Sequence, residues 1–154
     1  MKTVHGNLIK MALEGKFDVI IHGCNCFNTF GAGIALQIKR IFPDAYEADL
    51  KTIKGDRSKL GQITFSKITI GVLKPLIVVN GYTQYGYGGN APNVDYDAIR
   101  SVMWNVKDQF SGLRIGFPAI GAGLGGGDWN IISKIIDDEL DNLDYTYVIY
   151  SKEM

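Results

Sequence analysis

Strand-length apolar runs, several of them continuous rather than alternating, most constrain what this chain can fold into. A strand with one face in water alternates apolar and polar residues, whereas a strand covered by helices on both faces does not. Such runs occur at 17–21, 62–66, 76–79, 113–117 and 146–150, and a shorter one is expected at 2–5. The pattern therefore predicts a sheet whose strands are buried between helices.

The segments between these runs place apolar residues at helical spacing. This spacing predicts helices over 31–41, 95–110 and 129–140, and Pro43 with Asp44 is expected to open a further short helix. Alternation of strands and helices indicates a three-layer α/β/α sandwich around a mixed, mostly parallel sheet of about six strands. The 154 residues show no internal repeat or linker, so residues 1–154 are expected to form a single domain.

Charge and composition exclude some classes of function. Sixteen basic and sixteen acidic residues cancel, which argues against a strongly basic nucleic-acid surface but leaves a local patch open. No run approaches the length of a membrane span, and the first residues lack the pattern of a signal peptide.

The two cysteines, Cys24 and Cys26, are separated by one residue. In a strand their side chains would point to opposite faces, so a disulfide between them is geometrically poor. His22 is the single further ligand nearby, so no metal site is expected. Free thiols indicate a reducing compartment, and we expect a cytoplasmic protein, in the host cytoplasm if it is viral.

A first glycine-containing loop lies in the stretch HGCNCFNTFGAGIALQI, residues 22–38. Small and polar residues stand there at the point where a strand gives way to a helix. Such a backbone suits a partner that must approach closely.

A second loop lies in FPAIGAGLGGGDWNII, residues 117–132. Strand, glycine loop and helix are the geometry in which backbone N–H groups receive a phosphate. Gly121, Gly123 and Gly126 also satisfy G-x-G-x-x-G, but that fingerprint belongs to the first βαβ unit, and here a single strand follows. A nicotinamide dehydrogenase is thus disfavoured, and tight packing of the loop is the other alternative. Two such loops at one sheet edge could hold a diphosphate between them.

Four segments, taken in order, resemble the macro domain family of ADP-ribose-binding modules. They are HGNLIK, DVIIHGCNCFNTFGAGIALQI, VNGYTQYGYGGNAPNVDYDAIRS and PAIGAGLGGGDWNII, and the resemblance extends over essentially the whole chain. The third segment is most similar to the subgroup of ADP-ribose-1″-phosphate phosphatases from yeast, bacteria and tailed phages. The resemblance implies a macro domain-like fold and a small-molecule ligand, ADP-ribose or its 1″-phosphate.

The resemblance also implies site residues. Asn25 corresponds to the asparagine that holds the distal ribose, Asn7 to a residue that reads adenine, and Tyr150 to an aromatic that packs on adenine. The full set of implied ligand-binding residues is Asn7, Leu8, Cys24, Gly31, Ala32, Gly33, Ile34, Tyr82, Gln84, Gly121, Ala122, Gly123, Leu124, Gly125, Gly126 and Tyr150.

Two departures from the family pattern bear on activity. The family's hydrolases that strip ADP-ribose from macromolecules use a lysine in the loop that here reads NGYTQYGYG, which has none. Gly125 stands where the family has an aromatic residue or an aspartate, which predicts a more open distal end. Both departures disfavour lysine-dependent removal of ADP-ribose.

Four side chains are candidates for the chemistry: Asn25, His22, Asp128 and Asn28. His22 is a candidate general acid, with a buried strand-end histidine as the alternative. Asp128 opens the last predicted helix and is also a candidate N-cap, and Asn28 is also a candidate turn residue. Gln84 and Tyr85 are further candidates, and the loop tyrosines Tyr82, Tyr85 and Tyr87 could stack on a base or cover the sheet edge.

The expected function is hydrolysis of ADP-ribose-1″-phosphate to ADP-ribose and phosphate. The alternatives are a hydrolase that releases ADP-ribose from modified protein or nucleic acid, and a non-catalytic reader of ADP-ribose. No cofactor and no metal are expected. Beyond the small-molecule ligand we expect no membrane partner, nucleic acid solely as an ADP-ribosylated substrate, and a monomer.

Overall fold

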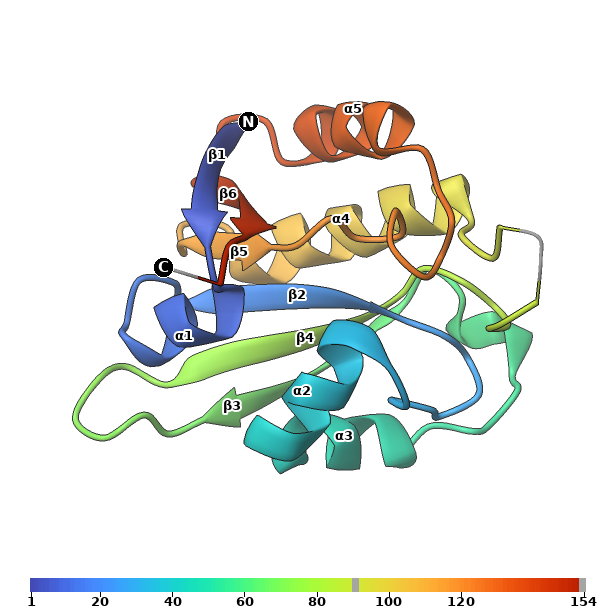
Figure 1. Ribbon diagram of the computed structural model, residues 1–154, viewed down its shortest axis with the longest axis horizontal. Helices are drawn as coiled ribbons and strands as arrows, with labels where there is room; N and C mark the ends of the chain where they lie inside the picture. Colours follow the sequence, from blue (N-terminus) through green and yellow to red (C-terminus); the bar gives the residue numbers. More distant parts are fainter. Residues whose placement is uncertain (90–91, 153–154) are drawn as a thin grey trace.

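The computed structural model describes residues 1–89 and 92–152. Its centre is a sheet of six strands in the order β1-β6-β5-β2-β4-β3 (Figure 1). The strands are β1 (Lys2–Gly6), β2 (Val19–Cys24), β3 (Ile63–Ile68), β4 (Leu76–Tyr82), β5 (Ile115–Phe117) and β6 (Tyr145–Tyr150). All neighbours pair in parallel except β3 and β4, which are antiparallel. The predicted mixed, mostly parallel sheet is confirmed.

Helices cover both faces of this sheet. They are α1 (Leu8–Leu13), α2 (Gly33–Ile41), α3 (Pro43–Leu50), α4 (Tyr96–Phe110) and α5 (Trp129–Glu139), with a 3-10 turn, η1, at Arg57–Lys59. In Figure 1, α1, α2 and α3 lie on one side of the sheet and α4 and α5 on the other. The α/β/α sandwich is thus confirmed, and α1 is a helix that the sequence pattern did not predict.

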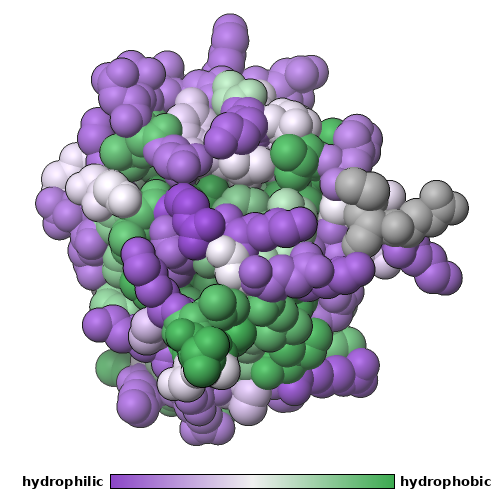
Figure 2. All heavy atoms as spheres, turned by 90° about the vertical axis from the view of Figure 1, so that its left-hand side faces the viewer, coloured by the Kyte–Doolittle hydropathy of each residue, from purple (hydrophilic) through white to green (hydrophobic). Residues whose placement is uncertain are grey.

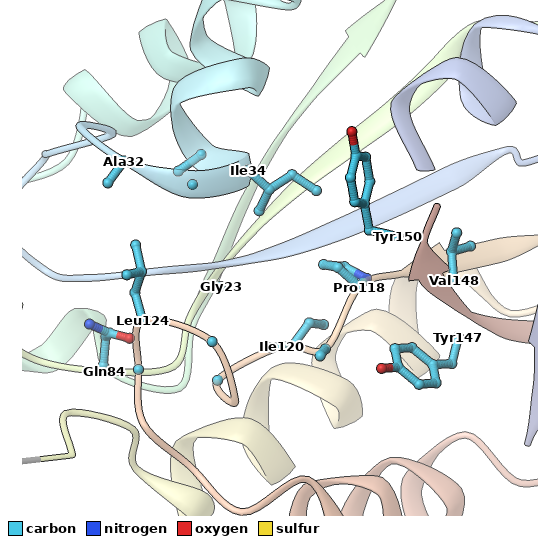
Figure 3. A pocket seen from close by; sticks show the side chains of 16 residues that line it. Gly23, Ala32, Ile34, Gln84, Pro118, Ile120, Leu124, Tyr147, Val148 and Tyr150 are labelled. Carbon is cyan, nitrogen blue, oxygen red and sulfur yellow. The ribbon is translucent and has the colours of Figure 1, made fainter. Parts of the chain in front are cut away.

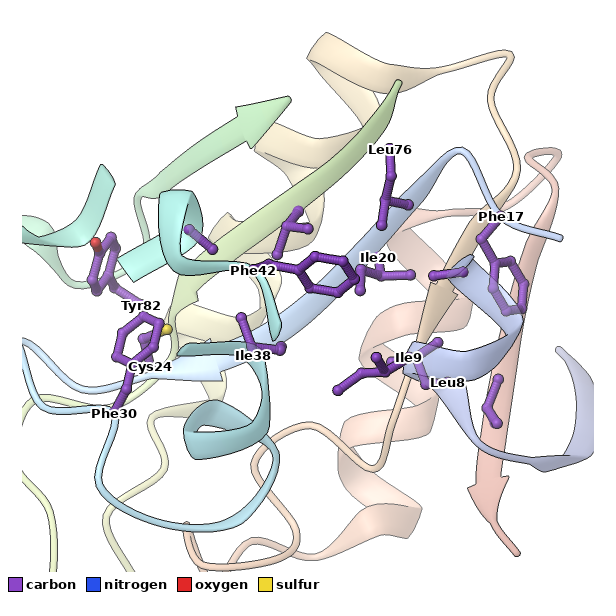
Figure 4. Packing of buried hydrophobic residues seen from close by; sticks show 14 of the residues in the cluster. Leu8, Ile9, Phe17, Ile20, Cys24, Phe30, Ile38, Phe42, Leu76 and Tyr82 are labelled. Atoms are coloured by element: carbon purple, nitrogen blue, oxygen red, sulfur yellow. The ribbon is translucent and has the colours of Figure 1, made fainter. Parts of the chain in front are cut away.

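Two hydrophobic clusters fill the two spaces between sheet and helices. Figure 4 shows the first, in which Ile20 and Leu76 of the sheet lie toward Ile38 and Phe42 from α2 and its end. The second contains Val19 and Ile21 of β2 with the buried face of α4 and α5. Because β2 contributes Ile20 to the first cluster and Val19 and Ile21 to the second, these three successive residues are all buried, as the apolar run predicted.

Polar side chains fix where several helices begin. The Asn7 carboxamide oxygen accepts the amide of Lys10 at the start of α1, and Asp95 accepts the amide of Ala98 at the start of α4. No side chain caps α2, which begins after Ala32. The open helix start lies at the carboxyl end of β2.

One side of the molecule carries several groups of apolar side chains among polar ones (Figure 2). Exposed Val72 and Leu73, in the turn that joins β3 to β4, lie on this side. None of the described helices combines the length and apolarity needed to cross a bilayer.

Candidate functional site

A long cleft crosses the edge of the sheet at which the parallel strands end. It consists of three adjoining hollows of about 370, 520 and 240 Å³. The central hollow shares Gly23, Ala32, Ala35, Gln84 and Leu124 with the second, and Gly33, Ile34, Pro118, Val148 and Tyr150 with the third. Because neighbours share walls, the hollows form one groove of a length that suits an extended ligand.

The two glycine loops form the facing walls of the central hollow. They follow β2 and β5, which are adjacent strands, so the loops meet at the same edge. Figure 3 shows Leu124 of the second loop pointing toward Ala32 at the start of α2. A Cβ atom on Gly33 would lie 3.4 Å from Leu124 Cδ1. The uncapped first turn of α2 therefore lines the hollow, where its dipole and amide groups favour an anion.

The glycines of the second loop serve two different purposes. Gly121 has φ +75°, and a Cβ there would lie 2.7 Å from Val94 Cγ2, so packing requires a glycine. Gly123 has no positive φ, and a Cβ there would meet nothing within 4 Å. Gly123 nevertheless lines the central hollow, so its missing side chain leaves space in the cleft rather than in the core.

The largest of the three hollows adjoins the central one, and Asn25, Thr29, Gly31 and Tyr87 line it. The Asn25 amide donates to Thr29 Oγ1 at 2.8 Å and to the Thr29 carbonyl at 3.1 Å, and its oxygen accepts the amide of Phe27 at 2.8 Å. Asn25 thus faces the cleft while it holds its own turn together.

Gly125 does not simply open this end of the cleft. A Cβ there would lie 2.8 Å from the Gly121 carbonyl oxygen and 2.9 Å from Gln84 Oε1. No side chain fits at Gly125 without movement of these groups, and Gln84 occupies the neighbouring wall of the hollow.

The smallest hollow lies at the opposite end, between α1 and β6. Asn7, Leu8, Gln37 and Tyr150 line it, and Tyr150 is 67% exposed at its rim. In Figure 3, Tyr150 lies past Ile34, away from the second glycine loop. The residues expected at an adenine end therefore do come together at one end of the cleft.

His22 does not reach the cleft. The side chain is fully buried on the α2–α3 side of β2, with Nε2 2.7 Å from Asn80 Oδ1 and its ring edge-on to Phe30. Burial lowers the pKa of His22 to about 4, against the opposite effect of the Asn80 hydrogen bond. The expected general acid is corrected to a neutral core histidine, because its ring packs against Asn80 and Phe30 in the interior and not in the cleft.

Asp128 and Asn28 are also placed outside the cleft. Asp128 caps α5 by accepting the amide of Asn130 at 2.9 Å, as the N-cap alternative predicted. Asn28 is a turn residue with φ +58°, and its oxygen accepts Lys59 Nζ at 2.6 Å. Neither side chain lines any of the three hollows.

Three of the implied ligand-binding residues lie elsewhere. Tyr82 is buried, and its hydroxyl donates to Asp49 Oδ1 at 2.7 Å. Ala122 and Gly126 belong to the second loop but line none of the hollows. The other implied residues all line the cleft.

Several lining residues were not predicted from the sequence. They are Ile9, Gly23, Thr29, Ala35, Gln37, Gly88, Gly89, Pro118, Ala119, Ile120, Tyr147 and Val148. Many follow a strand directly or lie near the end of one. The rule that ligands bind outside the carboxyl ends of parallel strands was the available signal.

The lining of the cleft carries no charged side chain among the described residues. It consists of glycine, alanine, apolar residues, amides, tyrosines, Thr29 and Cys24. Burial raises the pKa of the Cys24 thiol well above its usual value, so the thiol stays protonated. Within the described chain no cluster of three metal-ligating side chains occurs. Backbone amides, side-chain amides and hydroxyls are therefore what this cleft offers a ligand.

A six-stranded α/β/α sandwich with a neutral cleft between two glycine loops defines a class, and sequence comparison agrees with it. Residues 21–136 match the macro domain family, to which this chain belongs.

Individual relatives lie in phage and bacteria. An uncharacterized 17.5 kDa protein from the tk-vs intergenic region of Enterobacteria phage T4 is 36% identical over 96% of this chain and 95% of its own length. A DNA ADP-ribosyl glycohydrolase of Thermus aquaticus is 27% identical over 94% of this chain. This chain spans 39% of that enzyme's length. The solved macrodomain of Thermus aquaticus DarG superposes with a TM-score of 0.72 at 24% identity, covering 97% of each chain.

Proposed function

We propose that the cleft binds ADP-ribose and that the protein hydrolyses a bond at C1″ of the distal ribose. The observation that carries the proposal is the meeting of two glycine loops and the uncapped start of α2 over one neutral groove. Adenine would lie between Asn7 and Tyr150, the diphosphate between Gly33 and Gly123, and the distal ribose beside Asn25.

ADP-ribose-1″-phosphate is the substrate that this chemistry suits best. Phosphate takes the electron pair of the C1″–O bond as it leaves, and the proton that it then needs comes from the attacking water, so no acid of the protein is required. Water forms the new bond to C1″, and the proton that it loses passes to the departing phosphate, which leaves as hydrogen phosphate. The cleft, which presents no charged acid or base among its described lining residues, would contribute binding, orientation and fixed dipoles.

Removal of ADP-ribose from nucleic acid is the second candidate function. One relative is named a DNA ADP-ribosyl glycohydrolase, and it aligns with nearly the whole of this chain. The largest hollow lies at the distal end, where an attached macromolecule would leave the cleft. The described lining of the cleft supplies no lysine for such a reaction, so it would proceed without the amine that the family's hydrolases use.

The test supplies each substrate to the protein and measures its product. ADP-ribose-1″-phosphate should yield inorganic phosphate, and an ADP-ribosylated oligonucleotide serves as the competing substrate. If the protein releases ADP-ribose from the oligonucleotide but no phosphate from ADP-ribose-1″-phosphate, the second candidate function replaces the first. Binding without turnover of either substrate would make the protein a reader of ADP-ribose.

Binding is tested separately by thermal unfolding. A ligand at 100 times its dissociation constant stabilises the folded state by about 2.7 kcal/mol, which raises the melting temperature measurably. ADP-ribose should produce this rise and NAD a smaller one, because NAD carries a cationic ring on C1″ in a cleft where the uncapped start of α2 favours anions. Equal shifts with both ligands, or none with ADP-ribose, would refute the proposed ligand.

A further inference from the structure

The distal end of the cleft adjoins a surface built from residues 51–57 and from Tyr85 and Tyr87. Gly55 joins them, because its amide donates to the Cys26 carbonyl and its own carbonyl accepts the Tyr85 hydroxyl at 2.8 Å. The Phe27 ring lies between, with its centroid 4.9 Å from that of Tyr85 and 6.3 Å from that of Tyr87. We call Lys51, Lys54, Arg57, Tyr85 and Tyr87 the distal surface.

Cations of the distal surface lack carboxylate partners. Lys51, Lys54 and Arg57 are exposed, and none of them takes part in an ion pair within the described chain. The nearest acid in sequence, Asp56, accepts the amide and hydroxyl of Ser58 with one carboxylate oxygen. By contrast, Arg100 and Arg114 both pair with carboxylates. In a chain of zero net charge, this surface holds a local positive excess.

Aromatic rings lie among these cations. The Arg57 guanidinium carbon lies 3.9 Å from the centroid of the Tyr85 ring, so the exposed side of the guanidinium is a flat platform. Tyr87 is 59% exposed and also lines the largest hollow. A polymer attached at the distal ribose would contact Tyr87 first, because Tyr87 lines the hollow. It would contact the cations next, because they lie outside the lining.

We propose that the distal surface binds a single-stranded nucleic acid that carries the ADP-ribosyl group held in the cleft. The three cations, unpaired within the described chain, suit the charge of a phosphate backbone, while Tyr87 and the Arg57 platform suit unstacked bases. A duplex keeps its bases stacked inside and would leave the aromatic groups unused. This inference rests on the proposed ligand, and it favours the second candidate substrate class.

The experiment measures binding of three fluorescent probes. They are ADP-ribose, a short single-stranded oligonucleotide, and the same oligonucleotide with one ADP-ribosyl group on a base. The wild type should bind the modified oligonucleotide about tenfold or more tighter than ADP-ribose at low salt. Added salt should weaken binding of the modified oligonucleotide far more than binding of ADP-ribose, because the cleft itself is neutral.

Reversing the charge of single cations tests whether the distal surface binds the oligonucleotide. Arg57→Glu and Lys54→Glu should bring the affinity for the modified oligonucleotide down to that for ADP-ribose, while ADP-ribose affinity stays unchanged. Lys134→Glu, an exposed change on α5 across the sheet, is the matched control and should leave both affinities intact.

Three outcomes would overturn the inference. They are equal wild-type affinity for ADP-ribose and the modified oligonucleotide, an equal loss of affinity with Lys134→Glu, or tighter wild-type binding of an ADP-ribosylated peptide, added as a fourth probe, than of the modified oligonucleotide. Loss of ADP-ribose binding by the wild type would instead refute the proposed ligand. The unmodified oligonucleotide with Arg57→Glu would still test the surface, since its binding needs no ADP-ribose.

Discussion

At the scale of single residues, buried polar groups stabilise the loops that form the cleft. Lys59 is 7% exposed, and its Nζ donates to the Cys26 carbonyl at 3.1 Å and to Asn28 Oδ1 at 2.6 Å. These hydrogen bonds support the turn after β2 on the side away from the cleft that Asn25 and Thr29 line. A lysine with this role is not recognisable from sequence, because its partners lie some thirty residues earlier in the chain.

Lys59→Met should destabilise the fold by about 2–4 kcal/mol, because two hydrogen bonds from a buried charge are lost. Urea unfolding measures the loss, and hydrogen exchange should quicken most at residues 25–29. Lys107→Met, an exposed change on α4, is the control and should stay within about 0.5 kcal/mol of the wild type. Uniform exchange across the chain would argue against a local role for Lys59.

His22 should make stability depend on pH. Its pKa falls from 6.5 to about 4 on folding, so between these values the unfolded chain takes up a proton that the folded protein does not. The free energy of unfolding should therefore fall by on the order of 3 kcal/mol as pH drops from 6.5 to 4, with no effect of this residue above that range. His22→Gln should flatten this part of the profile, whereas His5→Gln, at an exposed site, should not. Parallel profiles for wild type and His22→Gln would contradict the assignment.

At the scale of elements, the glycine loop after β5 separates folding from binding. Gly123→Val should abolish ADP-ribose binding and leave the melting temperature nearly unchanged, because its Cβ meets no protein atom. Gly121→Val should lower the melting temperature strongly, because its Cβ would lie 2.7 Å from Val94 in a positive-φ conformation. Thermal unfolding and calorimetric titration of both variants make the test. An unfolded Gly123→Val protein would show that the loop serves packing alone.

Helices and strands were predictable where their burial produces a periodic or continuous apolar pattern in the sequence. The buried runs identified β2 and β4, and helical spacing placed α2, α4 and α5 within a few residues of their observed bounds. The short helix α1 was missed, since six residues give too little periodicity. Spacing in the glycine loops predicted the centre of the cleft. Residues such as Tyr147 and Ile120 were missed because they join the site through the strand order, which local sequence does not encode.

At the scale of the whole molecule, ionisable side chains lie away from the cleft, and turnover should therefore depend little on pH. The described lining holds no carboxylate, imidazole or amine, and His22 titrates at about pH 4 beneath the sheet. Turnover of ADP-ribose-1″-phosphate should therefore vary by less than about threefold between pH 7 and 9, above the second phosphate pKa of about 6. Initial rates of phosphate release across this range measure it. A bell-shaped profile would reveal an acid and a base that the cleft does not display.

Two of the glycine positions that line the cleft lead to an asymmetry in how mutation affects it. Gly31 and Gly123 have open space where a side chain would stand, so there is nothing to truncate there. An alanine scan, which shortens side chains, would pass over these positions and underestimate the site. A scan with valine or leucine would detect the site, because each added side chain would occupy space that a ligand in the cleft requires. Over evolution the site should tolerate extensive replacement around it, as long as these few positions never gain atoms.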